Sequence, residues 1–574
     1  RRIVGSPSLV NLSPLAGGTY VVRLLSKEFC ITKIYINYKR YSKTMNKSLL
    51  LPLLFGSACS AIAAEKPNII LIYIDDMGFA DLKCFGGPYQ TPNIDQLAKE
   101  GIRFSQYYSA CPISSPSRVA VTTGMYPARW GINTFLQTKS GNANAEQNDF
   151  LNSAAPSLAR SLKQNGYATA HFGKWHMGGG RDVYNAPAIT SYGFDEFSST
   201  WESPDPDPKL TSTNWIWADS DEVKRWDRTA YFVDKTLDFL SRNKGNKPCY
   251  INLWPDDVHT PFVFDADGEG NPNATNTRTL EPSFIVVLTE LDKQIGRLMQ
   301  GIKDLGLAEE TLVLFTSDNG PNPRYEGKRT LNLRGQKGQL YEGGIRLPFI
   351  AHWPGKIAPN QYNSQSILCS VDLFPTLCSI TGTPLPTDFQ PDGLDRSSIL
   401  LGGGHEDRSK PLFWQFGKFQ SNPKSPHIAV REGDWKLLVD VDGGRTELYN
   451  MKTDFLETKN VATENPLVTN RLKSMALDWF DEAYRQYADW PSDVGEILKN
   501  DNMHISPNPV RDVLNVFCPA QTYQVSIIDL NGCVEVINAE KQASKIDVHM
   551  LVPGIYFIML ESENKKYYSK FIKI

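Results

Sequence analysis

The sequence predicts an α/β fold in which a large mixed, mostly parallel sheet is flanked by helices. A smaller C-terminal α+β subdomain and a terminal all-β sandwich are expected to follow. Continuous apolar runs rich in β-branched residues, at 68–74 and 311–317, are typical of strands buried on both faces. Helical patterns alternate with such runs up to about residue 380. Beyond residue 500, alternating strand patterns and an Asn-Gly turn replace them.

The N-terminal segment precedes this fold. Met45 is followed by a short basic stub, an apolar stretch over 49–55 and small residues at 61–64. This is the pattern of a signal peptide, and it is too short for a membrane span. We therefore expect Met45 to be the true start, residues 1–44 to be an upstream non-native segment, and residues 45–64 to be a signal peptide. Lipidation of Cys59 is the less favoured alternative.

Length and composition restrict the classes of partner. A chain of 574 residues is too long for one ordinary domain. The net charge of −3 and the lack of basic runs argue against nucleic acid as a partner. Seven cysteines follow residue 64, and their scatter does not indicate a disulfide framework.

Three globular parts are expected after the signal peptide. The first, 65–381, carries helical patterns at 228–242 and 282–305. A Pro-rich stretch at 383–387 leads into the second, 382–490. The second part combines strand patterns at 428–430 and 435–439 with an amphipathic helix at 466–486. The third, 491–574, has strand patterns at 513–516, 524–529, 551–557 and 570–574.

Acidic and amide side chains follow the two buried strand patterns. Asp75 and Asp76 end the first, and Asp318 and Asn319 end the second. Because sites in open α/β sheets lie beyond the carboxyl ends of strands, neighbouring strands would bring the four together. Adjacent carboxylates repel unless a cation lies between them. Hard oxygen ligands without Cys or His favour Ca²⁺ or Mg²⁺ over zinc. The alternative is a pair of capped turns.

Basic residues recur after the other strand patterns. Lys174 and His176 follow the pattern at 167–172 and would point to one side if the chain stayed extended. His259 follows the pattern at 248–254, and Lys337 ends a short basic motif. Each alone has an ordinary interpretation, as a hydrogen-bonded histidine or a solvated lysine. Their joint occurrence in one chain is what indicates a site.

A helix start carries the most specific motif, Ser114-Ser115-Pro116-Ser117-Arg118 followed by Thr123-Gly124. Proline favours the helix start, Ser114 stands just ahead of it, and Arg118 follows one turn later on the same face. A reactive group would then lie at the positive end of a helix, beside a cation, which suits anion chemistry. Serine and proline also form turns by chance, so the motif needs the other residues for support.

Together these motifs resemble the formylglycine-dependent sulfatases, an arylsulfatase-like family within the alkaline-phosphatase-like superfamily. The resemblance covers about 66–486 and includes connecting phrases at 91–95, 432–437 and 447–450. It implies that Ser114 is oxidised to formylglycine and that Arg118 holds the hydrated aldehyde. It further implies one Ca²⁺ bound by Asp75, Asp76, Asp318 and Asn319. Lys174, His176, His259 and Lys337 would bind sulfate and transfer protons.

Two departures from the family pattern stand out. Serine replaces cysteine as the precursor, which implies a serine-type formylglycine-generating maturase acting before export. The family's Pro-His-x-Pro appears here as Asp256-Asp257-Val258-His259-Thr260-Pro261. The C-terminal region resembles the sorting domain of the Bacteroidetes type 9 secretion pathway. This implies secretion machinery as a partner and a periplasmic, cell-surface or secreted location. An accessory, carbohydrate-binding β-module is the alternative.

The expected function is therefore removal of O-sulfate from a sulfated glycan by an exo-acting carbohydrate sulfatase. One insertion holds Trp201, Trp215, Trp217 and Trp226, which could stack on sugar rings or simply pack. Candidates to contact hydroxyls or carboxylates are Arg181, Asp205, Asp207, Arg324 and Tyr325. A phosphatase or phosphonate hydrolase of the same superfamily is the alternative enzyme. An inactive glycan-binding protein is the alternative without catalysis.

Overall fold

A computed structural model of the chain describes residues 66–488 apart from 211–219, 266–280, 323–327, 388, 419 and 421. It also describes most strands between 504 and 573, and residues 18–25 and 30–38. The latter form an antiparallel pair, β1 (Gly18–Leu25) and β2 (Cys30–Tyr38). The signal peptide expected at 45–64, with Cys59, lies outside the described residues.

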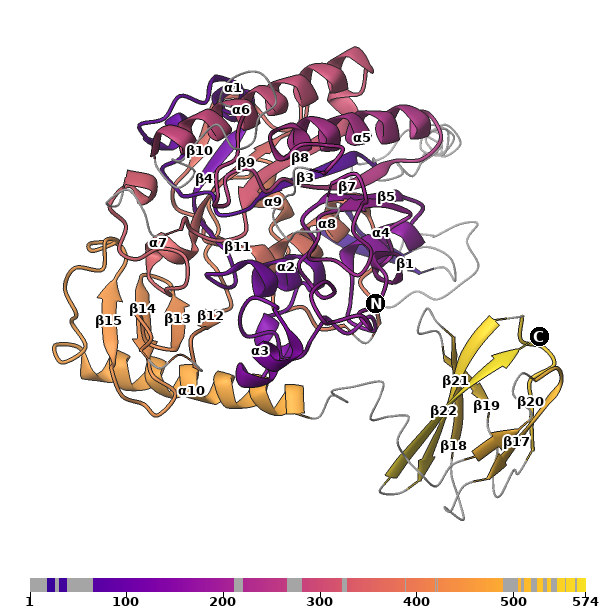
Figure 1. Ribbon diagram of the computed structural model, residues 1–574. Helices are drawn as coiled ribbons and strands as arrows, with labels where there is room; N and C mark the ends of the chain where they lie inside the picture. The colour runs from indigo at the N-terminus through magenta and orange to yellow at the C-terminus, as the bar shows by residue number, and fades with distance from the viewer. Residues whose placement is uncertain are drawn as a thin grey trace, which may run out of the picture. The chain divides into compact units, whose positions relative to one another are not determined.

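A nine-stranded sheet forms the centre of the largest part of the chain (Figure 1). Its order is β10-β4-β9-β8-β3-β7-β5-β6, with β11 beside β4. The strands are β3 (Asn68–Ile74), β4 (Ile102–Tyr108), β5 (Ala168–Gly173), β6 (Glu196–Ser199), β7 (Cys249–Trp254), β8 (Thr311–Ser317), β9 (Arg346–His352), β10 (Gln361–Asn363) and β11 (Leu368–Cys369). Among these, β9 runs antiparallel to its neighbours and the other pairings are parallel. The predicted mixed, mostly parallel sheet is confirmed.

The pairing of β3 with β8 fixes where the two acidic motifs meet. Asn68 lies opposite Thr311, and the register continues without a shift to Ile74 opposite Ser317. Both strands are fully buried, because apolar residues fill both of their faces. The two strands therefore end level, and the residues that follow them emerge at the same edge of the sheet.

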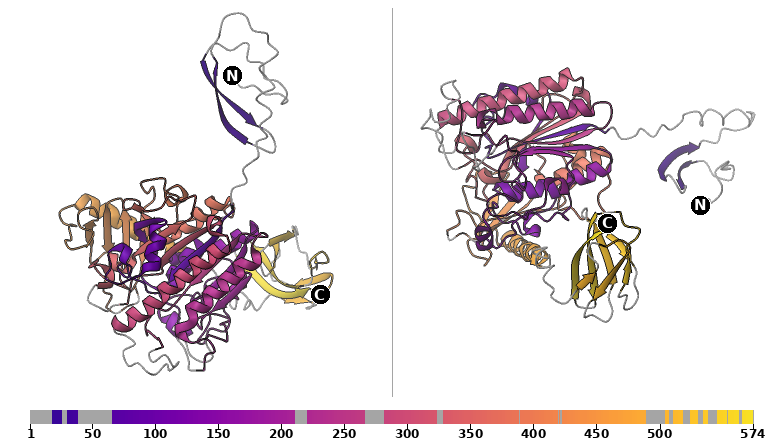
Figure 2. Two further views of the ribbon diagram at one scale, coloured as in Figure 1. Left: turned by 90° about the horizontal axis from the view of Figure 1, so that it is seen from above. Right: turned by 45° about the vertical axis from the view of Figure 1, so that its right-hand side comes forward.

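Helices cover both faces of the sheet, as Figures 1 and 2 show. Alternate residues of β3 face opposite sides, because side chains alternate along a strand. Ile70, Ile72 and Ile74 belong to a core with residues of α1 (Pro92–Lys99), α5 (Arg228–Asn243) and α6 (Glu281–Asp304). Ile69, Leu71 and Tyr73 belong to a core with residues of α2 (Ser114–Thr123), α4 (Leu158–Gln164), α8 (Leu373–Thr381) and α9 (Ser397–Leu400). The chain thus builds a three-layered α/β structure.

Shorter helices connect these elements. Two are α-helices, α3 (Lys139–Asn144) and α7 (Glu342–Ile345). The 3-10 turns are η2 (Lys83–Phe85), η3 (Pro127–Trp130), η4 (Ile189–Tyr192), η5 (Arg225–Asp227), η6 (Ala308–Glu310), η7 (Lys328–Thr330) and η8 (Ser370–Asp372). No helix in the described part of the chain is both long and apolar enough to cross a bilayer.

The next part is an antiparallel four-stranded meander with one long helix. Its strands are β12 (Leu412–Gln415), β13 (Ile428–Glu432), β14 (Trp435–Val439) and β15 (Glu447–Asn450), and its helix is α10 (Pro466–Ala488). Apolar residues of α10, such as Leu472 and Ala476, share a core with Leu438 of β14 and Ala120 of α2. This part is therefore packed against the layer that contains α2 through a common core.

The last part is an all-β sandwich. One sheet contains β16 (His504–Ser506), β17 (Val513–Phe517) and β20 (Lys545–Asp547). The other contains β18 (Gln524–Asp529), β19 (Val534–Ile537), β21 (Gly554–Ser562) and β22 (Lys565–Lys573). Leu514 and Ile546 of the first sheet and Ile527 and Ile558 of the second are buried in one core. The predicted terminal sandwich is confirmed.

Candidate active site

Four buried side chains meet at the level ends of β3 and β8. Asp318 Oδ1 accepts a hydrogen bond from Asp76 N at 3.0 Å, and Asn319 Nδ2 donates to Asp76 Oδ1 at 2.8 Å. Asp76 has a φ of 62°, a left-handed conformation that non-glycine residues adopt mainly at strained or functional positions. The structure therefore brings together the four predicted metal ligands, Asp75, Asp76, Asp318 and Asn319, all buried.

The start of α2 faces the same carboxylates. Ser114 Oγ donates to Asp75 Oδ1 at 3.1 Å and lies 3.3 Å from Asn319 Oδ1. Arg118 Nη2 lies 2.7 Å from Asp318 Oδ2 and 3.4 Å from Asp75 Oδ1. Ser114 lies within the first turn of α2, with Ile113 as N-cap, rather than just ahead of the helix. The predicted same-face relation of Ser114 and Arg118 holds, because four residues make about one helical turn.

Lys174 and His176 reach the site by different geometry from that predicted. Lys174 Nζ lies 2.8 Å from Asp75 Oδ2. The extended segment ends at Gly173, and His176 has a φ of 52°, so strand alternation does not align the two side chains. They are instead brought together by Glu202, whose Oε2 lies 3.8 Å from Lys174 Nζ and 3.3 Å from His176 Nε2.

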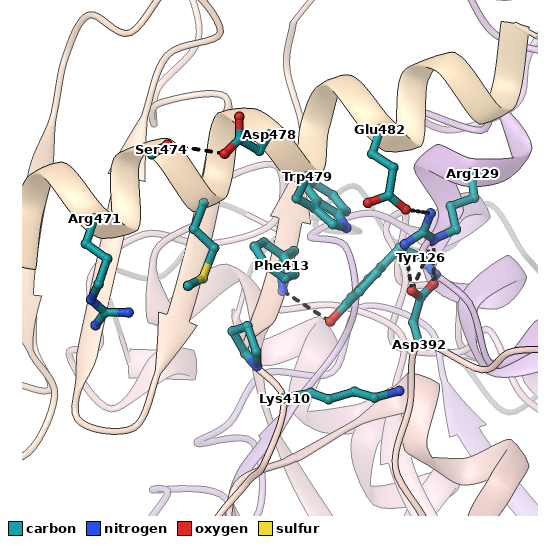
Figure 3. Close-up of a pocket in the computed structure, with 12 residues that line it drawn as sticks. Tyr126, Arg129, Asp392, Lys410, Phe413, Arg471, Ser474, Asp478, Trp479 and Glu482 are labelled. Atoms are coloured by element: carbon teal, nitrogen blue, oxygen red, sulfur yellow. Dashed lines mark hydrogen bonds and ion pairs between the residues drawn. The ribbon is translucent and has the colours of Figure 1, made fainter.

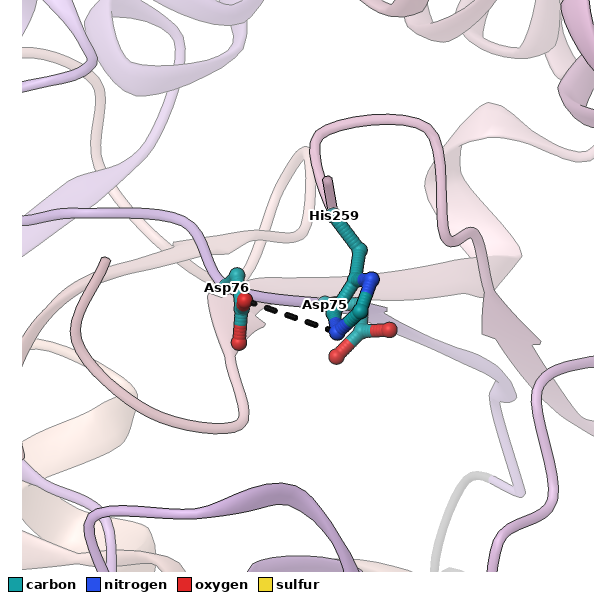
Figure 4. A group of neighbouring side chains, drawn as sticks. All are labelled: Asp75, Asp76 and His259. Carbon is teal, nitrogen blue, oxygen red and sulfur yellow. Dashed lines mark ion pairs between the residues drawn. The ribbon is translucent and has the colours of Figure 1, made fainter. Parts of the chain in front are cut away.

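His259 and Lys337 complete the set through contacts with Asp76. Lys337 Nζ lies 2.6 Å from Asp76 Oδ1, and His259 Nε2 lies 3.7 Å from Asp76 Oδ2. Figure 4 shows the His259 ring directed at the two aspartates. Nine of the ten predicted site residues thus contact one another directly, and His176 joins them through Glu202.

Charge and burial set the protonation of these groups. Burial alone would raise the pKa of Asp75, but Lys174, His259 and Arg118 hold it well below its usual range. Burial and the neighbouring Asp75 carboxylate raise the pKa of Asp318 to about 7. Burial lowers the pKa of His176 to about 3 and also lowers that of His259. Both histidines are therefore neutral near pH 7.

The donor set fits a hard divalent cation. Ligand atoms of Asp75, Asp76 and His259 all lie within 4.8 Å of one another. Asp76 Oδ2 is buried and accepts no hydrogen bond from the residues that the structure describes, which is costly for a carboxylate oxygen unless a cation satisfies it. His259 would add a nitrogen to this group, whereas the four predicted ligands, with Asp318 and Asn319, offer oxygens, the ligand type that Ca²⁺ and Mg²⁺ prefer.

Two buried residues at the site were not predicted from the sequence. Glu202 links Lys174 and His176, as described above. Arg225 of η5 holds the segment before His259: its Nη1 pairs with Asp256 Oδ2 at 2.5 Å, and its Nη2 donates to His259 O at 3.2 Å. A glutamate in a Pro- and Asp-rich loop and an arginine near a helix start both resemble solvated surface charges. Their roles follow only from contacts between distant segments.

We expect Arg225→Lys to lower kcat by about tenfold or more with little change in KM. Lysine keeps the positive charge opposite Asp256, but its single ammonium group cannot also donate to the His259 carbonyl as the planar guanidinium does. His259 should therefore lose its position in the site. Steady-state kinetics measures the effect, and thermal unfolding checks that the fold is retained. An unchanged kcat would show that Arg225 does not position His259.

The remaining saccharide candidates are only partly described. Trp215, Trp217, Arg324 and Tyr325 lie outside the described residues. Asp207 Oδ2 accepts hydrogen bonds from Ser198 and Tyr231, so it supports packing. Trp201 is half-buried, and the guanidinium of Arg181 lies 5.4 Å from its ring centroid.

A separate cavity of about 770 Å³ lies beside α10 (Figure 3). Tyr126, Phe413 and Trp479 line it, together with an ion-pair cluster. In that cluster Arg129 pairs with Asp392 and with Glu482, each at 3.0 Å. The charges are thus satisfied within the protein, and no predicted site residue lines this cavity.

Comparison with known proteins decides the family. Residues 67–383, more than half of the chain, match the family model described as "Sulfatase". The chain belongs to the sulfatase family. Residues 336–492 of this sulfatase match "N-sulphoglucosamine sulphohydrolase, C-terminal", and residues 504–574 match "Secretion system C-terminal sorting domain". The predicted resemblances to the sulfatases and to a sorting domain are both confirmed.

Individual relatives agree with this assignment. The sulfatase is 33% identical to human arylsulfatase A over 68% of its own length and 77% of the relative's. It is 29% identical to an N-acetylgalactosamine-6-O-sulfatase of Bacteroides thetaiotaomicron over 75% of its length and 98% of the relative's. Among solved structures it resembles Ps i-CgsB in complex with k-i-k-neocarrahexaose, with a TM-score of 0.60, 26% identity, and 75% and 96% of the two chains covered.

Proposed function

We propose that the chain is a carbohydrate sulfatase that hydrolyses O-sulfate esters of saccharides, with Ser114 oxidised to formylglycine. The observation that carries the proposal is the placement of Ser114 Oγ between Asp75 and Asn319, with Arg118 and Lys174 on the same carboxylates. The names of the relatives, which include N-acetylgalactosamine-6-sulfatases, support a sugar as the carrier of the sulfate.

Formylglycine supplies a geminal diol, one hydroxyl of which attacks sulfur while the other permits release of sulfate. Asp75 Oδ1, 3.1 Å from Ser114 Oγ, is placed to take the proton of the attacking hydroxyl. Arg118, Lys174 and Lys337 offset the charge that develops on the sulfuryl oxygens. Lys337 is placed to protonate the leaving alcohol, and His259, neutral near pH 7, could do so only after gaining a proton. Asp75, Asp76, Asp318 and Asn319 would hold Ca²⁺, which supplies Lewis-acid polarisation when bound.

His176 is suited to the second proton transfer. Its Nε2 lies 3.1 Å from Leu136 O, which can only accept, so Nε2 carries the proton. The other ring nitrogen, Nδ1, is buried and has no hydrogen-bond partner among the described residues. Its lone pair is therefore available to take a proton from the second diol hydroxyl as the sulfated intermediate collapses.

The test produces the protein together with a serine-type maturase and compares its rates of hydrolysis of matched sulfate and phosphate esters. We expect turnover of sulfated saccharides and of an aryl sulfate, and slower turnover of the matched phosphate. The proposal is wrong if the phosphate ester is the better substrate, which would favour the phosphatase alternative. Trisaccharides compared with long polymers test the predicted exo action.

The same proposal assigns roles to the parts of the chain. Residues 65–381 would carry catalysis, 382–490 would be the C-terminal sulfatase subdomain, and 491–574 would direct export. The match to a secretion sorting domain supports export, and surface display or release are its two expected ends.

Removing the residues after about Asn502 is expected to leave hydrolysis of a small sulfate ester nearly unchanged, since every proposed site residue precedes that point. Localisation in the producing bacterium should change instead, which fractionation measures. Loss of activity in a truncated protein that remains folded would place the sandwich in the active unit.

A further inference from the structure

We infer that Arg181, held against Trp201 and Glu202, forms a subsite for a second anionic group of the substrate beside the sulfate that is hydrolysed. This inference rests on the proposed function and adds the class of saccharide. The substrate would be acidic, carrying a carboxylate or a further sulfate close to the scissile one.

A chain of charges links this residue to the catalytic centre. Asp75 pairs with Lys174, Lys174 lies 3.8 Å from Glu202, and Glu202 Oε1 lies 2.8 Å from Arg181 Nη2. Side-chain exposure rises along this chain from 1% through 6% and 8% to 27%. His259 and Lys337 are 14% and 16% exposed, so Arg181 is the most open charge among these residues. It therefore lies at the solvent-exposed end of this chain of charges, where we place the part of the saccharide next to the sulfate.

The position of Arg181 is fixed by two closely packed loops. A Cβ atom at Gly179 would lie 2.2 Å from Pro204 N, so only glycine permits this close approach of the two loops. The φ of Gly179 is +89°, which also favours glycine. Arg181 itself has a φ of 55°. Its guanidinium lies over Trp201, and Glu202 engages Nη2, while its other N–H groups make no further hydrogen bond among the described residues. The guanidinium is thus held in place, and it keeps N–H groups that can donate hydrogen bonds to a ligand.

The chemistry of the group defines its ligand. A guanidinium presents planar paired donors that match a carboxylate or a sulfate, and it cannot be discharged near neutral pH. A cation already ordered by an indole and a carboxylate loses little freedom when it binds an anion. Hydrogen bonds to an anion are stronger than those to a neutral sugar hydroxyl, so the subsite favours acidic glycans.

The experiment compares Arg181→Gln and Arg181→Lys with the unaltered enzyme on three disaccharides of one sulfated sugar. One carries a uronic acid, one is its carboxyl-reduced form, and one is the reduced form with a second sulfate. We expect Arg181→Gln to lower kcat/KM for an acidic disaccharide about tenfold more than for the reduced one or for an aryl sulfate. Arg181→Lys should recover part of the loss. Whichever acidic disaccharide shows the larger fall in kcat/KM identifies carboxylate or sulfate as the preferred anion.

Arg242→Gln is the matched control, because Arg242 also pairs with a glutamate, Glu196, but contacts no site residue. It should leave all ratios unchanged. Calorimetric binding of the same disaccharides to the Ser114→Ala protein gives a readout that does not need turnover. Equal losses on all substrates would overturn the subsite and leave Arg181 as a support for Glu202. Absence of any preference for acidic disaccharides by the unaltered enzyme would also overturn it. Failure of the unaltered enzyme on every sulfate ester would instead refute the proposed function.

Discussion

Replacing Ser114 by alanine is expected to lower kcat by at least about 10³-fold, because the nucleophile and its exit route are removed together. An unmodified serine would form a sulfate ester with no second hydroxyl to expel sulfate. The variant should still fold, since it loses only the hydroxyl proton shared between Asp75 and Asn319, worth about 1 kcal/mol. Steady-state kinetics and thermal unfolding measure the two effects.

Mass spectrometry gives the companion measurement. In a host with a serine-type maturase, the peptide containing Ser114 should be lighter by two hydrogen atoms, as oxidation of the side chain to an aldehyde requires. Ser115→Ala is the matched control, because Ser115 is buried on the same helix but accepts from Leu136 N and touches no carboxylate of the site. A fully active protein with unmodified Ser114 would refute the formylglycine mechanism.

Removing the metal should have an effect of similar size. Asp318→Ala is expected to abolish binding of one hard divalent cation and to lower kcat about 10³-fold or more, since Lewis-acid stabilisation contributes several kcal/mol. Asp318→Asn keeps the shape of the side chain and tests the charge alone. Metal analysis of the purified variants, with kcat measured in excess Ca²⁺ and after chelation, provides the readout.

The same variants also allow the effect of Ca²⁺ on the free energy of unfolding to be measured. If Ca²⁺ binds the folded state, a hundredfold excess over its Kd should add about 2.7 kcal/mol to the free energy of unfolding. This gain should vanish in Asp318→Ala and persist in Asp238→Ala, a control on the surface of α5 that pairs with Arg242. Zinc at full occupancy, or two metals close together, would contradict the calcium prediction and favour the phosphatase alternative.

The ends of the two strands could be predicted because a few neighbouring residues specify them. Seven apolar residues followed by Asp75-Asp76 or Asp318-Asn319 specify a buried strand and a polar edge within a few positions. Apolar strands that need cover on both faces indicated a parallel pairing of β3 and β8, whereas their register is known only from the structure. The helix start at Ser114 was predictable for the same reason, apart from its first turn.

His176 shows where such reasoning fails. Alternation along an extended segment predicted that it would point to the same side as Lys174, but the strand ends at Gly173 and the backbone at His176 is left-handed. The two side chains still converge, because Glu202 from another loop lies between them. Here the prediction of neighbourhood was right and its geometric reason was wrong.

The sequence by itself determined the α/β fold class, the family and the ten residues around the carboxylates, because periodicity and short motifs encode them locally. Only the tertiary structure showed that Glu202 and Arg225 contact the site, and that Arg181, one of the sequence candidates, pairs with Glu202. These charges are solvated in the unfolded chain and take part in the site only when loops far apart in sequence exclude water around them. Burial and pairing are properties of the packed chain, so no local pattern could reveal them.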